Sequence, residues 1–119
     1  MDTKSAVRWY QFGERAKSEL IICSQLTIAV AGFKEGAERA GGKKTLLLLL
    51  DAVRAEIEFG FRDTGSMSFR RSADLVSEAI SLVESDGYEP AGLKISGAVS
   101  EATTAAQTGW QVLSEHGLL

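Results

Sequence analysis

Acidic side chains are the most concentrated source of possible chemistry in this sequence. Glu35 and Glu38 are three positions apart, so a helix would present both on one side. Asp51, Glu56 and Glu58 follow on the next segment. Two antiparallel helices could bring such carboxylates together, and their oxygens are ligands that Mg²⁺ and Mn²⁺ prefer. One candidate function is therefore a metal-dependent hydrolase of nucleotides or other phosphoesters. We favour the alternative that these are solvent-facing charges paired with nearby basic residues, which requires no cofactor.

Basic residues form a second candidate site, in this case for nucleic acid. Lys43 and Lys44 flank one expected turn, while Arg70 and Arg71 flank another. A phosphate backbone is bound by several cations on one face. The two turns are expected at different ends of an up-and-down bundle, and the whole chain carries a net charge of −3. We therefore expect ordinary solubilising charges, with a nucleic-acid-associated helical subunit as the alternative.

The single cysteine and the single histidine exclude several kinds of site. Cys23 alone cannot form an intramolecular disulfide or a thiolate cage for zinc. His116 stands near the end of the sequence, so a Ser–His–Asp or Cys–His relay is not expected. The sequence has no secretory pattern and no run of about 20 apolar residues. We expect a cytoplasmic protein that does not span a membrane and is not an enzyme.

Length and composition predict one domain. The chain has 119 residues, 45% hydrophobic and 24% charged, which is enough for a single core and too few for two. Residues 1–71 carry a net charge of +3 and residues 72–119 a net charge of −6. We interpret this asymmetry as complementary charge between neighbouring helices of one fold. The alternative is salt-sensitive association of unlike surfaces between chains.

Apolar residues recur every three or four positions in four segments, which is typical of helices. The segments cover roughly 4–40, 46–61, 69–83 and 91–116. Gly41 and Gly42 are expected to end the first helix, and Thr45 to cap the second. A break near Gly32 or Gly36 is also compatible with the pattern. Residues 20–31 are rich in β-branched side chains, so a strand is the competing interpretation there.

The pattern predicts an all-α domain over residues 1–119, a compact antiparallel bundle of about four helices. The inner side of the last segment consists largely of small residues, which would let another helix approach closely. Trp110 is expected to give this inner line bulk at one end. The small residues of the segment are Gly97, Ala98, Ala102, Ala105, Ala106 and Gly109.

The first two segments contain more apolar residues than one buried stripe requires. Five consecutive leucines occupy positions 46–50, and positions 20–33 carry no charge. A bundle this small could cover only part of that surface. We therefore predict a non-catalytic association module that forms a homodimer through its first two helices. The predicted interface residues are Ile21, Ile28, Leu47 and Leu48.

Overall fold

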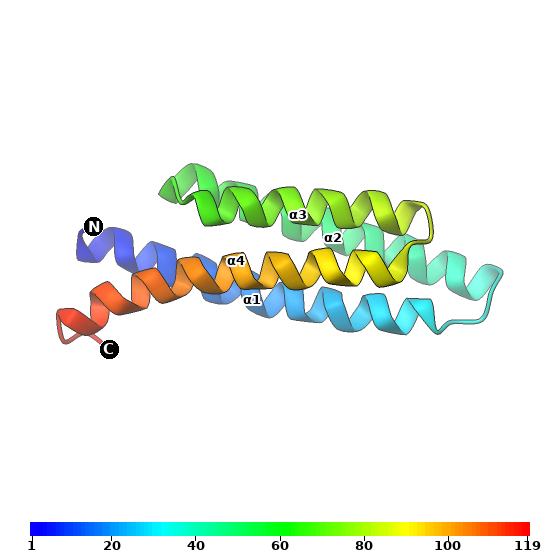
Figure 1. Cartoon of the computed structure of the whole chain (residues 1–119), viewed down its shortest axis with the longest axis horizontal. Coiled ribbons are helices and arrows are strands. Elements are labelled where there is room, and N and C mark those ends of the chain that lie inside the picture. Colours follow the sequence, from blue (N-terminus) through cyan, green and yellow to red (C-terminus); the bar gives the residue numbers. More distant parts are fainter.

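The computed structural model describes residues 1–119, and its regular structure is entirely helical (Figure 1). Four antiparallel helices follow one another: α1 (Thr3–Ala31), α2 (Ala37–Thr64), α3 (Met67–Glu84) and α4 (Tyr88–Glu115). They form an elongated bundle of 54 × 22 × 18 Å. The prediction of an antiparallel all-α bundle is confirmed, and the strand considered for residues 20–31 is wrong. No helix combines the length and the continuous apolar character needed to cross a bilayer.

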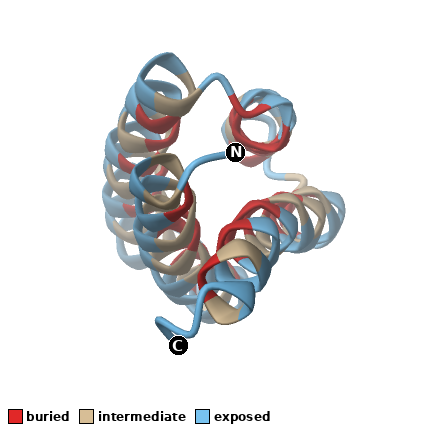
Figure 2. Cartoon of the chain, turned by 90° about the vertical axis from the view of Figure 1, so that its left-hand side faces the viewer, coloured by how far each residue is buried: buried red, intermediate tan, exposed pale blue.

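Each helix turns its apolar stripe toward a common core (Figure 2). Around this core, α1 packs against α2 and α4, and α3 packs against the other sides of the same two helices. Leu20, Leu50, Val76 and Ile95, one from each helix, are completely buried, as is Phe69, the largest of the fully buried side chains. Burial of these stripes supplies the stability that isolated helices lack in water.

Small residues bring α1 and α4 very close together. A Cβ atom added at Gly13 would lie 2.6 Å from the backbone nitrogen of Ala106, and one added at Gly109 would lie 2.5 Å from the carbonyl oxygen of Ala6. Only glycine permits this approach. The predicted close packing of the last helix is thus confirmed, and α1 is its neighbour. Because α1 and α4 pack so tightly, their solvent-facing sides form one continuous surface.

The turn between the first two helices lies between Gly32 and Gly36, where the sequence allowed a break, and not at Gly41 and Gly42. α1 ends at Ala31, and Gly36, with φ of 102°, precedes α2. Gly42 lies inside α2, where the ring of Phe33 occupies the space a Cβ atom would need. The prediction of a first helix that reaches residue 40 is therefore wrong, because Gly42 packs against Phe33 inside α2 and does not end a helix. Thr45, predicted as an N-cap, also lies inside α2.

Candidate functional site

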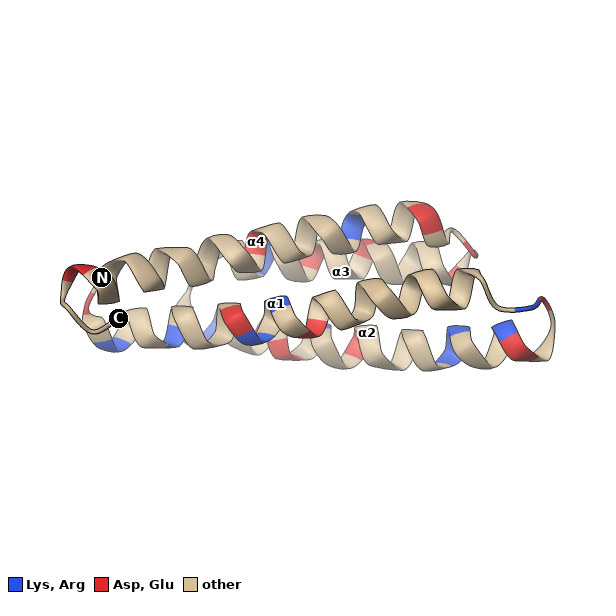
Figure 3. Cartoon of the chain, turned by 90° about the horizontal axis from the view of Figure 1, so that it is seen from below, with Lys and Arg blue, Asp and Glu red and all other residues tan.

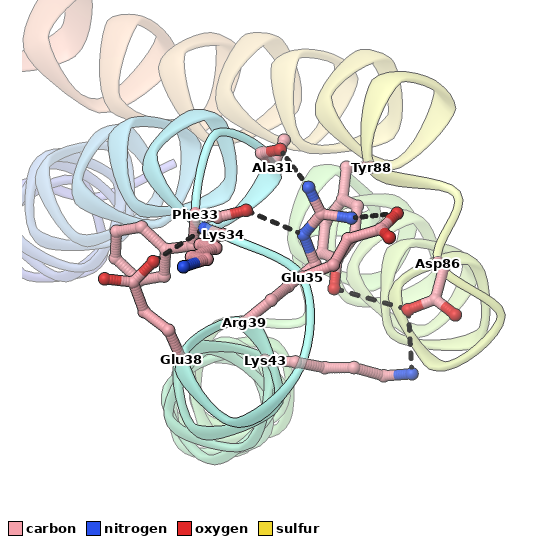
Figure 4. Close-up of polar contacts among 9 residues, drawn as sticks. All are labelled: Ala31, Phe33, Lys34, Glu35, Glu38, Arg39, Lys43, Asp86 and Tyr88. Atoms are coloured by element: carbon pink, nitrogen blue, oxygen red, sulfur yellow. Dashed lines mark hydrogen bonds and ion pairs between the residues drawn. The ribbon is translucent and has the colours of Figure 1, made fainter.

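The carboxylates considered as metal ligands each have another partner. Glu38 accepts a hydrogen bond of 2.6 Å from the backbone N–H of Lys34, and Glu35 forms an ion pair of 3.4 Å with Arg39 (Figure 4). Both contacts hold the loop between α1 and α2. These two carboxylates therefore stabilise the turn.

The other three candidate ligands are spread along α2. Asp51 and Glu58 both form ion pairs with Arg54, and Glu56 pairs with Arg15 of α1 at 2.7 Å. No group of three Asp, Glu, His or Cys side chains is placed to hold a metal ion. The structure does not bring the five predicted ligands together.

Cations near the same loop cap helix ends (Figure 4). Arg39 donates hydrogen bonds of 3.1 Å to the carbonyl oxygens of Ala31 and Phe33, at the end of α1. Lys43 donates to the carbonyl oxygen of Glu84 at 2.8 Å and pairs with Asp86 at 3.1 Å, at the end of α3. Positive side chains are favourable at the carboxyl ends of helices, where carbonyl groups lack partners. These contacts explain the positions of both cations without a ligand.

The predicted nucleic-acid residues do not share one surface. Lys43 and its neighbour Lys44 lie at the level of the end of α3, whereas Arg70 and Arg71 lie near its start. About 20 Å of helix separates the two pairs. Arg71 forms an ion pair of 3.0 Å with Glu101. Arg71–Glu101 and Lys43–Asp86 also join the positive and negative parts of the sequence within one fold, as expected.

A pair of carboxyl groups lies between α1 and α2 and was not found from the sequence. Glu19 faces Glu56 across the two helices, and Arg15 contacts both carboxyl groups, at 3.3 and 2.7 Å. Burial and the neighbouring Glu56 raise the pKa of Glu19 to about 7. The adjoining cavity has a volume of about 10 Å³, which is room for one water molecule. This space is too small for a substrate.

The environment of the single cysteine, Cys23, does not suit catalysis. Cys23 is completely buried one turn beyond Glu19. Burial, together with the nearby Glu19, raises the pKa of the thiol to about 11. A protonated, buried thiol is a poor nucleophile. Cys23 acts as a small apolar residue of the core.

The predicted interface residues lie on different surfaces. Leu47 is half-buried against the core, so only part of its side chain is left to contact a partner. Leu48 is 70% exposed on the outer side of α2, while Ile28 is 72% exposed on α1 beside α4. Ile21, one heptad before Ile28, is 42% exposed. The leucine run therefore does not form a single patch with the two isoleucines.

We call the outward-facing surface of α1 and α4 the α1/α4 face. Its residues from α1 are Tyr10, Glu14, Lys17, Ile21 and Ile28, and those from α4 are Glu89, Gly92, Leu93, Thr103, Gln107 and Trp110. Two grooves lie on it, one at each end. The larger, of about 440 Å³, lies between Tyr10 and Trp110, and the smaller, of about 270 Å³, lies beside Ile28.

This face is almost free of charge. In Figure 3 the right-hand half of α1 carries no charged residue, and the left-hand half of α4 carries none before Glu115 at its end, since none occurs in 20–33 or in 102–114. Glu14 and Lys17 pair with each other at 3.1 Å. Lys94 and Glu101, the charges in the middle of α4, turn toward α3 and pair there. Glu89, at the smaller groove, is charged and exposed. The rest of the face presents mostly neutral side chains to solvent.

Trp110 is the residue of this face that sequence reasoning placed wrongly. It was expected in the core, yet it is 48% exposed at the rim of the larger groove. The small residues Ala106 and Gly109 occupy the inner line, so the indole is displaced outward. The missing charges in 102–114 were a signal for this surface that the sequence contained.

A comparison of the chain with protein families, with curated proteins and with solved structures finds no match in any of the three. The candidate site is therefore argued from the geometry of this chain. Its defining features are the neutral α1/α4 face, the exposed apolar side chains on it and the two grooves.

Proposed function

We propose that the protein is a non-catalytic helical association module that forms a homodimer through the α1/α4 face. The observation that carries the proposal is a long surface with almost no charge and several large exposed apolar side chains. These are Ile21 and Ile28 from α1, and Leu93 and Trp110 from α4. The centres of protein interfaces are depleted in charged residues and enriched in aromatic ones. This face has both properties.

The size of the face suits a specific dimer. The 29 residues of α1 give a length of about 43 Å. Two helices side by side, each about 10 Å across, then offer about 800 Å² per copy. Standard specific interfaces bury about this area on each partner. The α1/α4 face is thus large enough without any other part of the molecule.

Charge favours a second copy of this chain as the partner. The only charges near the centre of the face, Glu14 and Lys17, neutralise each other, so the centres of two copies meet without like-charge repulsion. The outer side of α2 also exposes Leu48 and Phe59, but charged residues of both signs flank them. Two copies joined there would have to remove more charged groups from water. The α1/α4 face is therefore preferred over the surface of the first two helices.

The proposal retains two expectations from the sequence, a non-catalytic role and a cytoplasmic location. The five carboxylates considered for hydrolysis have partners within the chain, as do Lys43, Arg70 and Arg71 among the cations considered for nucleic-acid binding, so no contact favours those functions. A cytoplasmic setting suits a chain whose single thiol is free and buried in the core.

The test compares two lysine substitutions at equally exposed sites. Ile28→Lys places a charge on the α1/α4 face, and Leu48→Lys places the same charge on α2, at 72% and 70% exposure of the original side chains. A twofold dimer loses the contact twice, so we expect Ile28→Lys to raise the dimer dissociation constant about 100-fold. Leu48→Lys should leave it nearly unchanged.

Sedimentation equilibrium over a range of protein concentrations measures both constants. Circular dichroism checks that each variant keeps its helix content. A dimer broken by Leu48→Lys and kept by Ile28→Lys would move the interface to the first two helices. A wild-type chain that stays monomeric at tens of micromolar would refute self-association altogether.

A further inference from the structure

We infer that the two copies pair antiparallel, so that Ile28 of each copy enters the larger groove of the other between Tyr10 and Trp110. The twofold axis lies in the interface at right angles to the helices and passes beside Ile21. This inference rests on the proposed dimer and specifies its geometry.

A protruding side chain and a matching groove occupy opposite ends of the face. Ile28 is the most exposed large apolar side chain of α1. The groove of about 440 Å³ lies toward the other end of the bundle, lined by Tyr10 and Glu14 from α1 and by Thr103, Gln107 and Trp110 from α4. Aromatic rings and an alanine form its apolar part, which suits an aliphatic side chain. Ile28 cannot reach this groove within its own chain.

The spacing along α1 fixes where a twofold axis must pass. The centre of the groove lies level with residue 12, so 16 positions, or about 24 Å of helix, separate it from Ile28. A twofold dimer repeats every contact, so the axis lies halfway between two regions that meet. Halfway is position 20, and the exposed apolar residue next to it is Ile21. Ile21 would therefore pack against Ile21 of the partner subunit.

The three features are consistent with one arrangement. The twofold axis places Ile28 of each copy opposite the larger groove of the other copy. Residues beside the axis must pack against the same residues of the partner subunit, and the residue there is the neutral, aliphatic Ile21. The ring of Trp110, half exposed, would then cover the smaller groove beside Ile28 of the partner subunit. A parallel dimer would instead set Ile28 beside its own counterpart and leave the larger groove uncovered.

Disulfide trapping of single-cysteine substitutions tests this geometry. Cys23 is fully buried and gives a background without accessible thiols. We expect Ile21→Cys to form a disulfide-linked dimer under mild oxidation. Ile28→Cys alone and Gln107→Cys alone should remain uncrosslinked, whereas a mixture of the two should yield a covalent dimer. Wild-type protein under the same oxidant is the control.

The outcomes separate the geometry from the dimer itself. Crosslinking of Ile28→Cys to itself, with none in the mixture, would overturn the antiparallel arrangement and indicate a parallel one. No crosslinking in any sample, while light scattering of the reduced variants still shows dimers, would also overturn it. Reduced variants and wild type that are all monomeric would refute the proposed function instead.

Discussion

Arg15 joins two carboxyl groups that meet across α1 and α2. One guanidinium faces both Glu19 and Glu56, so the trio holds one negative charge too many when both acids are ionised. The side chain of Glu19 is 27% exposed, and the nearest titratable group besides these is the buried Cys23. On α3 the cavity meets only the uncharged Phe69. Protonation of Glu19 relieves the repulsion, which explains why its pKa is raised to about 7.

This raised pKa predicts how stability depends on pH. The folded chain holds the Glu19 proton up to about pH 7, whereas the unfolded chain releases it near the ordinary value of 4.5. Between these values the folded state binds more protons, so the free energy of unfolding falls as the pH rises. Glu19→Gln keeps a hydrogen-bonding group and removes the titration. We expect the variant to exceed wild type by about 1 kcal/mol above pH 7, since water weakens the full effect.

Urea unfolding at a fixed protein concentration, from pH 4.5 to 8, measures the difference. It should shrink toward the acid end of the range, where Glu19 is protonated in both states. Glu58→Gln is the matched control, because Glu58 lies on the exposed side of α2 and pairs with Arg54 at 3.8 Å. Equal pH profiles for wild type and Glu19→Gln would show that the pair does not titrate as described.

At the scale of the helices, glycines have two different roles. Gly109 lets α4 approach α1, whereas Gly41 lies in α2 with nothing within 4 Å of the position of its Cβ. We expect Gly109→Ala to lower the free energy of unfolding by about 1–3 kcal/mol, because backbone atoms must move apart. Gly41→Ala should raise it by about 0.5–1 kcal/mol, because alanine favours a helix. Thermal and urea unfolding of both variants provide the comparison.

The Gly41 substitution also decides between two placements of the first turn. A glycine that ends a helix takes a left-handed conformation, in which alanine is strained. Destabilisation by Gly41→Ala would therefore support the turn first expected from the sequence. Stabilisation supports the observed one, in which Gly36 carries the positive φ.

Helix identity was predictable from the sequence, and so were the ends of α3 and α4 to within three residues, while the turn between α1 and α2 was not. The three-to-four-residue spacing of Leu20, Cys23, Thr27 and Val30 indicates a helix despite the β-branched residues around them. From the sequence alone, a glycine such as Gly42 looks the same whether it ends a helix or lies inside one. Only contact with Phe33, nine residues earlier, shows which role it has. Likewise, Glu56 was identifiable as chemically interesting, but Glu19 becomes so only when α1 packs against α2.

At the scale of the molecule, the sequence showed that apolar residues exceed what the core requires, but it did not show which of them lie on the same surface. The sequence correctly placed Ile21 and Ile28 outside the core, yet it grouped them with Leu47 and Leu48. Whether two exposed residues share a surface depends on how the helices are arranged around the core. Here α1 packs most closely on α4, so its isoleucines share a face with Trp110 and not with the leucines. The predicted homodimer stays a proposal, with its preferred face moved accordingly.

Salt dependence separates the two ways in which this chain could associate. A dimer through the mostly neutral α1/α4 face buries apolar surface and, from each copy, one internally compensated ion pair and Glu89. It contains no attraction between opposite charges of the two copies that ionic screening could weaken strongly. We expect its dissociation constant, measured by sedimentation equilibrium, to change less than about threefold between low and high NaCl. Association of the positive and negative parts of the sequence would weaken at least about tenfold. Leu48→Lys alters the net charge outside the face, so its dissociation constant should be as insensitive to salt as that of wild type. A steep salt dependence of the dissociation constant in either protein would favour electrostatic pairing of unlike surfaces.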